Sequence, residues 1–171
     1  GNYAEPPVLA FEGPPGIGKT SFAKHAIAKS LNRPFCFITL SGANEACYLT
    51  GHSYTYEGST PGRIVEEIIN ANCMDPVLYF DELDKISKTS RGDELVNTLI
   101  QLTDPVQNHD FRDRYIGNIP INLSKAIIVF SFNDSTMIHP ILLDRIKCIQ
   151  CEVPSKERKQ EIAMNYLIPQ I

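Results

Sequence analysis

The sequence predicts a three-layer α/β fold, in which helices flank both faces of a five-stranded, mostly parallel central sheet. Short apolar runs alternate with longer segments whose apolar residues recur at helical spacing, which is the pattern of β-α-β units. The apolar runs are nearly continuous, as expected of strands that are buried on both faces. A glycine-rich loop also separates the first predicted strand from the first predicted helix.

The predicted strands are the apolar runs bounded by turn residues: Val8–Glu12, Phe35–Leu40, Val77–Asp81, Ala126–Phe132 and Cys148–Val153. The predicted helices are the segments with helical periodicity: Lys19–Ser30, Gly62–Asn72, Asp93–Leu102, Pro140–Arg145 and Ser155–Leu167. Ser155 follows Pro154 and is a suitable N-cap for the last helix. Between Thr103 and Leu123, frequent Asp, Asn, Gly and Pro residues predict an excursion from the sheet, with a small hairpin around Gly117-Asn118.

The loop Gly13-Pro14-Pro15-Gly16-Ile17-Gly18-Lys19-Thr20, followed by Ser21, fits the pattern G-x-x-x-x-G-K-[ST] of phosphate-binding loops. Its glycines let the backbone turn tightly, so that N–H groups can point at the phosphates of a nucleotide. The ammonium group of Lys19 suits the β- and γ-phosphates, and the hydroxyl of Thr20 suits Mg²⁺. The alternative is a Gly/Pro turn without a ligand. The helix N-terminus that follows disfavours it, because its partial positive charge attracts an anion.

Two carboxylates, Asp81 and Glu82, end the apolar run that begins at Val77. An acidic side chain at the end of a buried strand is costly unless it binds a cation or joins a polar network. Asp81 is therefore predicted to position Mg²⁺, and Glu82 to act as the general base for the water that attacks the γ-phosphate. A pair of solvated acids is the alternative. Together with the phosphate-binding loop, the pair predicts hydrolysis of a Mg²⁺-bound nucleoside triphosphate.

Asn133 follows another predicted strand, and Arg145 precedes the last one. The carboxyl ends of parallel strands meet at one edge of a sheet, so Asn133 can lie near Asp81 and orient water with a neutral amide. A turn residue is the alternative interpretation, since Asn-Asp-Ser favours turns. For Arg145, a surface ion pair with Asp144 is one interpretation that the residues allow.

The bulk properties are those of an ordinary globular protein. The 171 residues suffice for one domain with a real core, and 43% of them are hydrophobic and 21% charged. The net charge of −4 gives no electrostatic basis for binding nucleic acid, and no apolar run is long enough for a membrane span. The five scattered cysteines predict reduced thiols, hence a cytoplasmic compartment or an equivalent one such as the mitochondrial matrix.

Cys148 and Cys151 have the C-x-x-C spacing of some zinc and redox sites. Residues three apart on a strand point to opposite faces, and no second pair of ligands accompanies the two thiols. Packing in the core is therefore predicted for both.

The complete set of motifs resembles the AAA+ ATPases, and among them most closely the ATPase module of the Lon proteases. The pieces most particular to Lon lie outside the nucleotide motifs, in Gly51-His52, Thr55–Gly62, Arg91-Gly92-Asp93 and Asp104–Asn108. All matching pieces together cover nearly the whole chain. The resemblance implies a single AAA+ nucleotide-binding subdomain over residues 1–171, in which 155–171 form the last helix and lead towards a helical lid.

The resemblance also implies ligands and roles. The ligands are ATP or ADP with Mg²⁺. The implied roles are Walker A for Lys19 and Thr20, Walker B for Asp81 and Glu82, sensor 1 for Asn133, and arginine finger for Arg145. Because such an arginine reaches the nucleotide of a neighbouring subunit, hydrolysis is expected to require assembly into a homo-oligomeric, hexameric ring.

Lon-like rings hold their polypeptide substrates with an aromatic-hydrophobic-Gly loop that faces the central pore. The resemblance places this loop at Tyr56-Glu57-Gly58, with Tyr56 stacking against the threaded polypeptide. Glu57 replaces the usual aliphatic residue. This departure is expected to change the grip on the substrate and to leave the nucleotide chemistry intact. Ordinary packing is the alternative for Tyr56. The segment Ile86–Gly92 is expected to carry the second pore loop.

No segment of the chain resembles the Ser-Lys peptidase domain of Lon, and the lid would begin about where the chain ends. The chain by itself is therefore predicted to be monomeric, to bind nucleotide weakly and to hydrolyse it poorly. Three alternatives to a Lon-type motor stay open: an unfoldase or chaperone whose full-length chain has no peptidase, a clamp-loader-like or DNA-remodelling ATPase, and a non-hydrolysing structural relative. Sequence beyond Ile171 would distinguish the first alternative from a Lon-type protease. Salt-dependent DNA binding would support the second.

Overall fold

Five parallel strands form the sheet at the centre of the molecule, in the order β2-β3-β4-β1-β5. The computed structural model describes residues 6–43, 45–53, 55, 57–117, 119–162, 164–165 and 168. The strands are β1 (Leu9–Glu12), β2 (Phe35–Thr39), β3 (Val77–Asp81), β4 (Ile127–Phe132) and β5 (Lys147–Gln150). The predicted parallel sheet is thus confirmed, although its last strand begins one residue and ends three residues before the predicted bounds.

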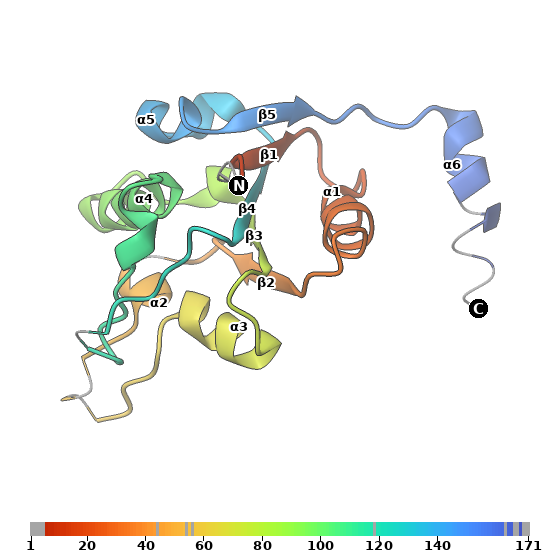
Figure 1. Cartoon of the computed structure of the whole chain (residues 1–171). Helices are drawn as coiled ribbons and strands as arrows, with labels where there is room; N and C mark the ends of the chain where they lie inside the picture. Colours follow the sequence, from red (N-terminus) through yellow and green to blue (C-terminus); the bar gives the residue numbers. More distant parts are fainter. Residues whose placement is uncertain are drawn as a thin grey trace.

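Helices cover both faces of this sheet (Figure 1). On one face, α1 (Lys19–Phe22) continues into η1 (Ala23–Ala28), where the hydrogen bonding is of the π type. The opposite face carries α2 (Cys47–Thr50), α3 (Arg63–Ala71) and α4 (Ser90–Thr103), and α5 (Pro140–Leu143) packs beside α4. Short 3₁₀ turns follow β3, α4 and β4, as η2 (Leu83–Lys85), η3 (Asn108–Asp110) and η4 (Ser135–Met137). The three predicted layers are therefore present.

Two hydrophobic clusters lie on opposite faces of the sheet. Successive side chains of a strand point to opposite faces. On β3, Leu78 and Phe80 accordingly join the larger cluster under α3 and α4, whereas Val77 and Tyr79 join the smaller cluster under η1. All four are 0% exposed, so the continuous apolar run of β3 is buried on both faces, as the sequence predicts. Burial of this strand fixes where Asp81 and Glu82 emerge.

Helix α4 begins three residues before its predicted start. The hydroxyl oxygen of Thr89 accepts a hydrogen bond from the backbone N–H of Gly92 at 3.3 Å, so Thr89 is the N-cap. Residues 90–92, which the sequence assigns to a second pore loop, therefore form the first turn of a helix. Of the predicted second pore loop, only residues 86–89 lie outside this helix.

The edge strand β5 requires a correction. Among the described residues it pairs with β1 alone, and all four of its residues are exposed, so this strand is not covered on its two faces. Cys148 is exposed, so the prediction that it packs in the core is wrong, whereas Cys151 is half-buried and packs against the smaller hydrophobic cluster. The physical reason is the place of the strand: the helices that flank the central strands do not extend over this edge. All five cysteines, which lie within the described ranges, are free thiols, in agreement with the sequence.

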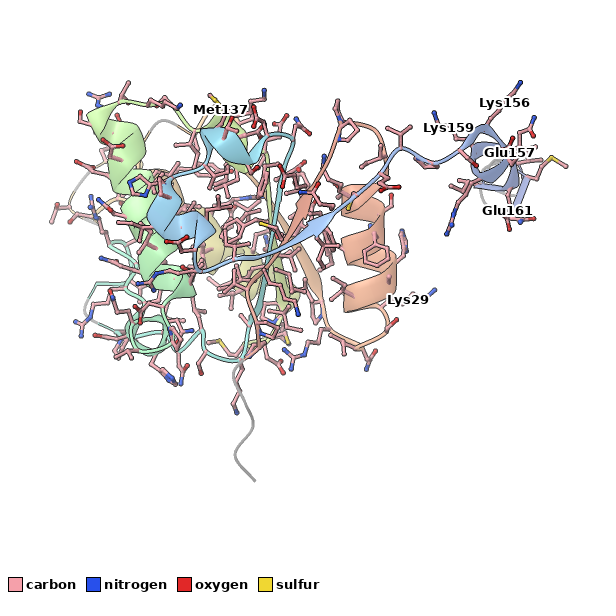
Figure 2. All side chains as sticks on the ribbon, turned by 90° about the horizontal axis from the view of Figure 1, so that it is seen from above. Lys29, Met137, Lys156, Glu157, Lys159 and Glu161 are labelled. Carbon is pink, nitrogen blue, oxygen red and sulfur yellow. The ribbon has the colours of Figure 1, made fainter. Side chains whose placement is uncertain are left out.

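The last helix, α6 (Lys156–Ile162), lies apart from the three layers (Figures 1 and 2). The Ser155 hydroxyl accepts a hydrogen bond from the N–H of Arg158 at 3.3 Å, in keeping with the predicted N-cap. None of the α6 residues is buried, and charged side chains surround the helix in Figure 2. Leu167, its predicted end, lies outside the described residues. Within the described part of the chain, every helix is too short or too polar to traverse a bilayer.

The excursion after α4 pairs with itself through one antiparallel bridge between Phe111 and Ile121. The predicted hairpin around Gly117-Asn118 is thus reduced to a single bridge within the described residues, and Asn118 lies outside them.

Candidate active site

A cavity of about 390 Å³ lies at the carboxyl ends of β3 and β4, beside the N-terminus of α1. It is lined from three parts of the chain that are far apart in sequence: Pro15, Gly16 and Gly18 to Ser21 from the loop, Asp81, Glu82 and Asp84 after β3, and Ser131 to Asn133 from β4. Parallel pairing explains this convergence, because it brings the carboxyl ends of neighbouring strands to one edge of the sheet. Gly13, Pro14 and Ile17 do not line the cavity.

Lys19 joins the loop to the end of β4. Its ammonium group donates hydrogen bonds to the carbonyl oxygens of Gly13 at 2.5 Å and Pro14 at 3.1 Å, and to the side-chain oxygen of Asn133 at 2.9 Å. An ammonium group has three protons, and each has an acceptor here. The predicted water-orienting amide, Asn133, thus lies directly beside Lys19, the residue predicted to bind the phosphates.

Two glycines of the loop have structural roles that only glycine can fill. Gly18 is the N-cap of α1 and adopts the left-handed conformation, with φ 92° and ψ 19°. At Gly13, a Cβ atom would lie 2.3 Å from the carbonyl oxygen of Cys151. The close approach of these two backbones holds the start of the loop against the segment after β5.

Gly13→Ala is expected to lower the free energy of unfolding by about 3 kcal/mol, because one of the two backbones must move. Gly16→Ala is the matched control, since nothing lies within 4 Å of a Cβ atom there. Its positive φ of 76° still costs about 1–2 kcal/mol. Urea unfolding of both variants measures the difference, and equal losses would contradict the steric argument.

The predicted magnesium ligands, Thr20 and Asp81, line the same cavity. Hydroxyl and carboxylate oxygens are the ligands that Mg²⁺ prefers. A second carboxylate, Asp84, is only 8% exposed; its Oδ2 accepts a hydrogen bond from the N–H of Asn133 at 3.3 Å. Its Oδ1 is buried and has no partner among the described residues. A buried oxygen of this kind is costly unless a bound group satisfies it, so the site fits a hydrated cation.

Glu82 has an unusual backbone conformation, with φ 60° and ψ 46°. A residue with a Cβ atom loses about 1–2 kcal/mol in this left-handed region. The fixed end of β3 on one side and the turn η2 on the other hold Glu82 in this conformation, at the wall of the cavity. Such local strain is concentrated at functional sites in proteins, which supports an active role for this carboxylate.

Arg145 lies outside the cavity that the loop and the strand ends form. It lines a separate cavity of about 310 Å³, and its guanidinium group pairs with the Asp104 carboxylate at 2.8 Å. Hydrogen bonding to this guanidinium group, followed by two backbone N–H groups, holds the pKa of Asp104 below its ordinary value. The alternative interpretation, an ion pair with Asp144, is therefore replaced by an ion pair with Asp104. Arg145 is not among the residues that line the first cavity of its own chain.

The predicted pore loop connects α2 to α3. Tyr56 lies outside the described residues, and Glu57 and Gly58 are exposed in a turn. The base of this loop is held by Asp113, whose side chain is 0% exposed. Its Oδ2 accepts from the N–H of Gly62 at 2.7 Å, and its Oδ1 accepts from the N–H of Tyr115 at 2.8 Å.

Several residues of the site have no separate role in the sequence interpretation. Asp84 is visible there only as part of the run Asp81–Ile86, and Ser131 and Tyr79 are strand residues. Polar side chains inside otherwise apolar strands are the signal that could have identified the last two. For Asp113, its run of charged neighbours gave no sign that it is buried.

Comparison with known proteins agrees with this geometry. Residues 9–153 match the family model described as "ATPase family associated with various cellular activities (AAA)". The chain is 44% identical over 168 residues to "Lon protease homolog 2, peroxisomal" of Oryza sativa subsp. indica, which covers 98% of this chain and 19% of that protein. It is 45% identical over 163 residues to "Lon protease" of Helicobacter pylori, which covers 95% of this chain and 19% of that protein. With "Lon protease homolog" of Acanthamoeba polyphaga mimivirus, the identity is 43% over 165 residues, which covers 96% of this chain and 16% of that protein. The chain thus spans about a fifth or less of the length of these relatives.

Proposed function

The chain belongs to the AAA family of ATPases, and from this premise we propose that it is the ATP-hydrolysing motor module of a Lon-type, ATP-dependent protease. The observation that carries the proposal is the meeting of Lys19, Asp81 and Glu82 at one cavity, within a chain whose similarity to Lon proteases extends over nearly its whole length. In such a protein, the module drives the unfolding of substrate proteins and their translocation into a peptidase chamber.

The residues of the cavity divide the work of hydrolysis. The loop N–H groups and Lys19 bind the β- and γ-phosphates, and Lys19 exchanges its present carbonyl acceptors for phosphate oxygens. Thr20 and Asp81 hold Mg²⁺, which neutralises charge on the phosphate oxygens when bound. Glu82 takes a proton from the attacking water. Asn133, tethered by Lys19 and Asp84, orients that water without adding a negative charge.

Assembly completes the proposed function. Six modules form a homo-oligomeric ring in a reducing compartment, and the loop Tyr56-Glu57-Gly58 of each contacts the polypeptide in the pore. Arg145 reaches the γ-phosphate held by the neighbouring module. Its place outside the cavity of its own chain supports this role. The 171-residue chain alone is expected to stay monomeric in gel filtration and to turn over ATP poorly.

Arg145→Ala is expected to lower ATP turnover of the assembled full-length protein by about 10³-fold, because an arginine finger stabilises charge in the transition state. Nucleotide affinity of the isolated chain should not change. Arg112→Ala is the matched control, since Arg112 is an exposed arginine paired with Asp110. Steady-state phosphate release measures turnover. Normal turnover in Arg145→Ala would exclude the finger role.

The proposed function is tested with the full-length protein, an unfolded test protein and MgATP. Peptide products that form only with hydrolysable ATP support a Lon-type protease. ATP-dependent unfolding without cleavage would favour the alternative, an unfoldase without a peptidase. The net charge of −4 gives no support to a DNA-associated function. Absence of ATP hydrolysis in the assembled protein would contradict the motor function altogether.

A further inference from the structure

A cysteine, a histidine and a glutamate gather beside the short helix α2. The Cys47 thiol, the His52 imidazole and the Glu45 carboxylate each offer one ligand atom, and the three atoms all lie within 4.8 Å of one another. Glu45 and His52 are exposed, and Cys47 is half-buried. None of the three lines the nucleotide cavity. Thiolate, imidazole and carboxylate are the side-chain ligands of Zn²⁺ in proteins, so this group has the donor set of a zinc site.

The backbone around α2 determines where His52 lies. The N–H of Gly51 donates a hydrogen bond to the carbonyl oxygen of Cys47 at 2.8 Å. Gly51 has a φ of 74°, and a Cβ atom there would lie 2.8 Å from the backbone nitrogen of Gly62. The chain therefore leaves the helix at a position that requires glycine. The N–H of His52 then donates to the carbonyl oxygen of Thr60 at 3.3 Å. These bonds hold His52 near the beginning of the same helix.

The distances between the ligand atoms suit a tetrahedral metal ion. Zn²⁺ bonds of about 2.0–2.3 Å in tetrahedral geometry put neighbouring ligand atoms roughly 3.3–3.8 Å apart. The thiol of Cys47 donates a hydrogen bond to Oε2 of Glu45 at 3.3 Å, so these two atoms already have that separation. The His52 ring is exposed, and its rotation closes the remaining gap. A thiolate and an imidazole favour Zn²⁺ over Mg²⁺, which prefers oxygen ligands, so the chemistry differs from that of the nucleotide cavity.

The two oxygens of Glu45 have different partners. Oε1 pairs with the guanidinium group of Arg91, in the first turn of α4, at 2.8 Å, whereas Oε2 accepts from Cys47. Carboxylates that bind metals are typically held by an outer hydrogen bond of this kind. Arg91 can therefore keep Oε1 while Oε2 binds an ion. The thiolate and the carboxylate together carry the two negative charges that balance Zn²⁺.

We propose that Glu45, Cys47 and His52 form a binding site for Zn²⁺, with water as the fourth ligand. Binding forms one Zn–O, one Zn–S and one Zn–N bond to the protein, and the proton of the Cys47 thiol passes to the solvent. Helix α2 packs against α3 and α4 (Figure 1). The bound ion fastens the beginning of the predicted pore loop to α2 and, through Arg91, to α4. The inference does not depend on the proposed nucleotide chemistry.

Metal titrations of the 171-residue chain test the site. The chain is freed of metal with a chelator, kept reduced and titrated with Co²⁺, which takes the place of Zn²⁺ and absorbs strongly in the near ultraviolet when a thiolate binds it. Zn²⁺ is then added, and the loss of this absorption gives its relative affinity. The expected result is a single Co²⁺ per chain with thiolate absorption, displaced fully by Zn²⁺.

Two variants remove ligands, and two matched controls remove the same side chains elsewhere. Cys47→Ser should abolish the thiolate absorption. Both Cys47→Ser and His52→Ala should weaken Zn²⁺ binding by at least about tenfold, which is the smallest usual cost of changing even an outer partner of a ligand. Cys148→Ser and His139→Ala alter an exposed thiol and an exposed imidazole, and should change neither property.

Zn²⁺ affinity that is unchanged in Cys47→Ser or in His52→Ala would overturn the site. So would a Co²⁺ complex without thiolate absorption, or absorption that is lost in Cys148→Ser and kept in Cys47→Ser. The affinity for ADP with Mg²⁺ should be the same in Cys47→Ser, His52→Ala and the unmodified chain, since neither residue lines the nucleotide cavity. Failure of the proposed function gives a different result, because the chain would then bind Zn²⁺ as expected and fail to bind the nucleotide.

Discussion

Glu82→Gln is expected to lower ATP turnover of the assembled protein by about 10²- to 10⁴-fold, the usual contribution of a general base. Glutamine has nearly the same size and can adopt the same backbone conformation, but it cannot accept a proton from water. MgATP binding should be kept or strengthened, because a negative charge near the γ-phosphate is removed. The two measurements are steady-state phosphate release and binding of MgATP by calorimetry.

Glu94→Gln is the control for this prediction, since Glu94 is an exposed glutamate on α4. It should leave both turnover and binding unchanged. The combination of lost turnover with intact binding assigns Glu82 to the chemical step. Turnover that survives Glu82→Gln would instead favour the interpretation of Asp81 and Glu82 as solvated acids at the end of a strand.

Asp113→Ala is expected to lower the free energy of unfolding by about 3–5 kcal/mol, a large effect for a single residue. Asp113 is fully buried, and its carboxylate accepts backbone hydrogen bonds at Gly62, Tyr115 and Ile116. Alanine removes the carboxylate, so these three N–H groups lose their acceptor. For a chain of this length, the melting temperature should fall by about 10 °C or more.

The same substitution at Asp110 is the control, because Asp110 is exposed and pairs with the exposed Arg112. Asp110→Ala should change the free energy of unfolding by less than about 0.5 kcal/mol. Asp113→Asn keeps one carbonyl oxygen as an acceptor and should lie between the two. Equal melting temperatures for Asp113→Ala and Asp110→Ala would show that the carboxylate does not hold the base of the predicted pore loop.

The central strands and their order of alternation with helices could be predicted from the sequence. The run Val77–Asp81 was predicted with the observed bounds, since a strand covered on both faces is apolar at every position. The phosphate-binding loop was equally visible, because its glycines and Lys19 are required at fixed spacing. Convergence of the loop with Asp81 and Asn133 follows from parallel pairing alone.

Other features depend on contacts between distant segments and could not be predicted. Ile149 is apolar, yet β5 is an edge strand, and its exposure depends on how far the flanking helices extend. Arg145 pairs with Asp104, 41 residues earlier in the chain, and not with its neighbour Asp144. The hydroxyl of Tyr79 meets Thr20 only because α1 packs over β3, and nothing local to Tyr79 indicates that contact.

The central claim is that the loop Gly13–Thr20 holds a nucleoside triphosphate whose Mg²⁺ lies between Thr20 and Asp81. A crystal structure with Mg²⁺ and a non-hydrolysable ATP analogue tests it most directly. The prediction is that the β- and γ-phosphates contact Lys19 and the loop N–H groups, with the metal bound by the Thr20 hydroxyl and close to Asp81. An analogue bound at another face of the molecule, with Lys19 still on the carbonyl oxygens of Gly13 and Pro14, would contradict it.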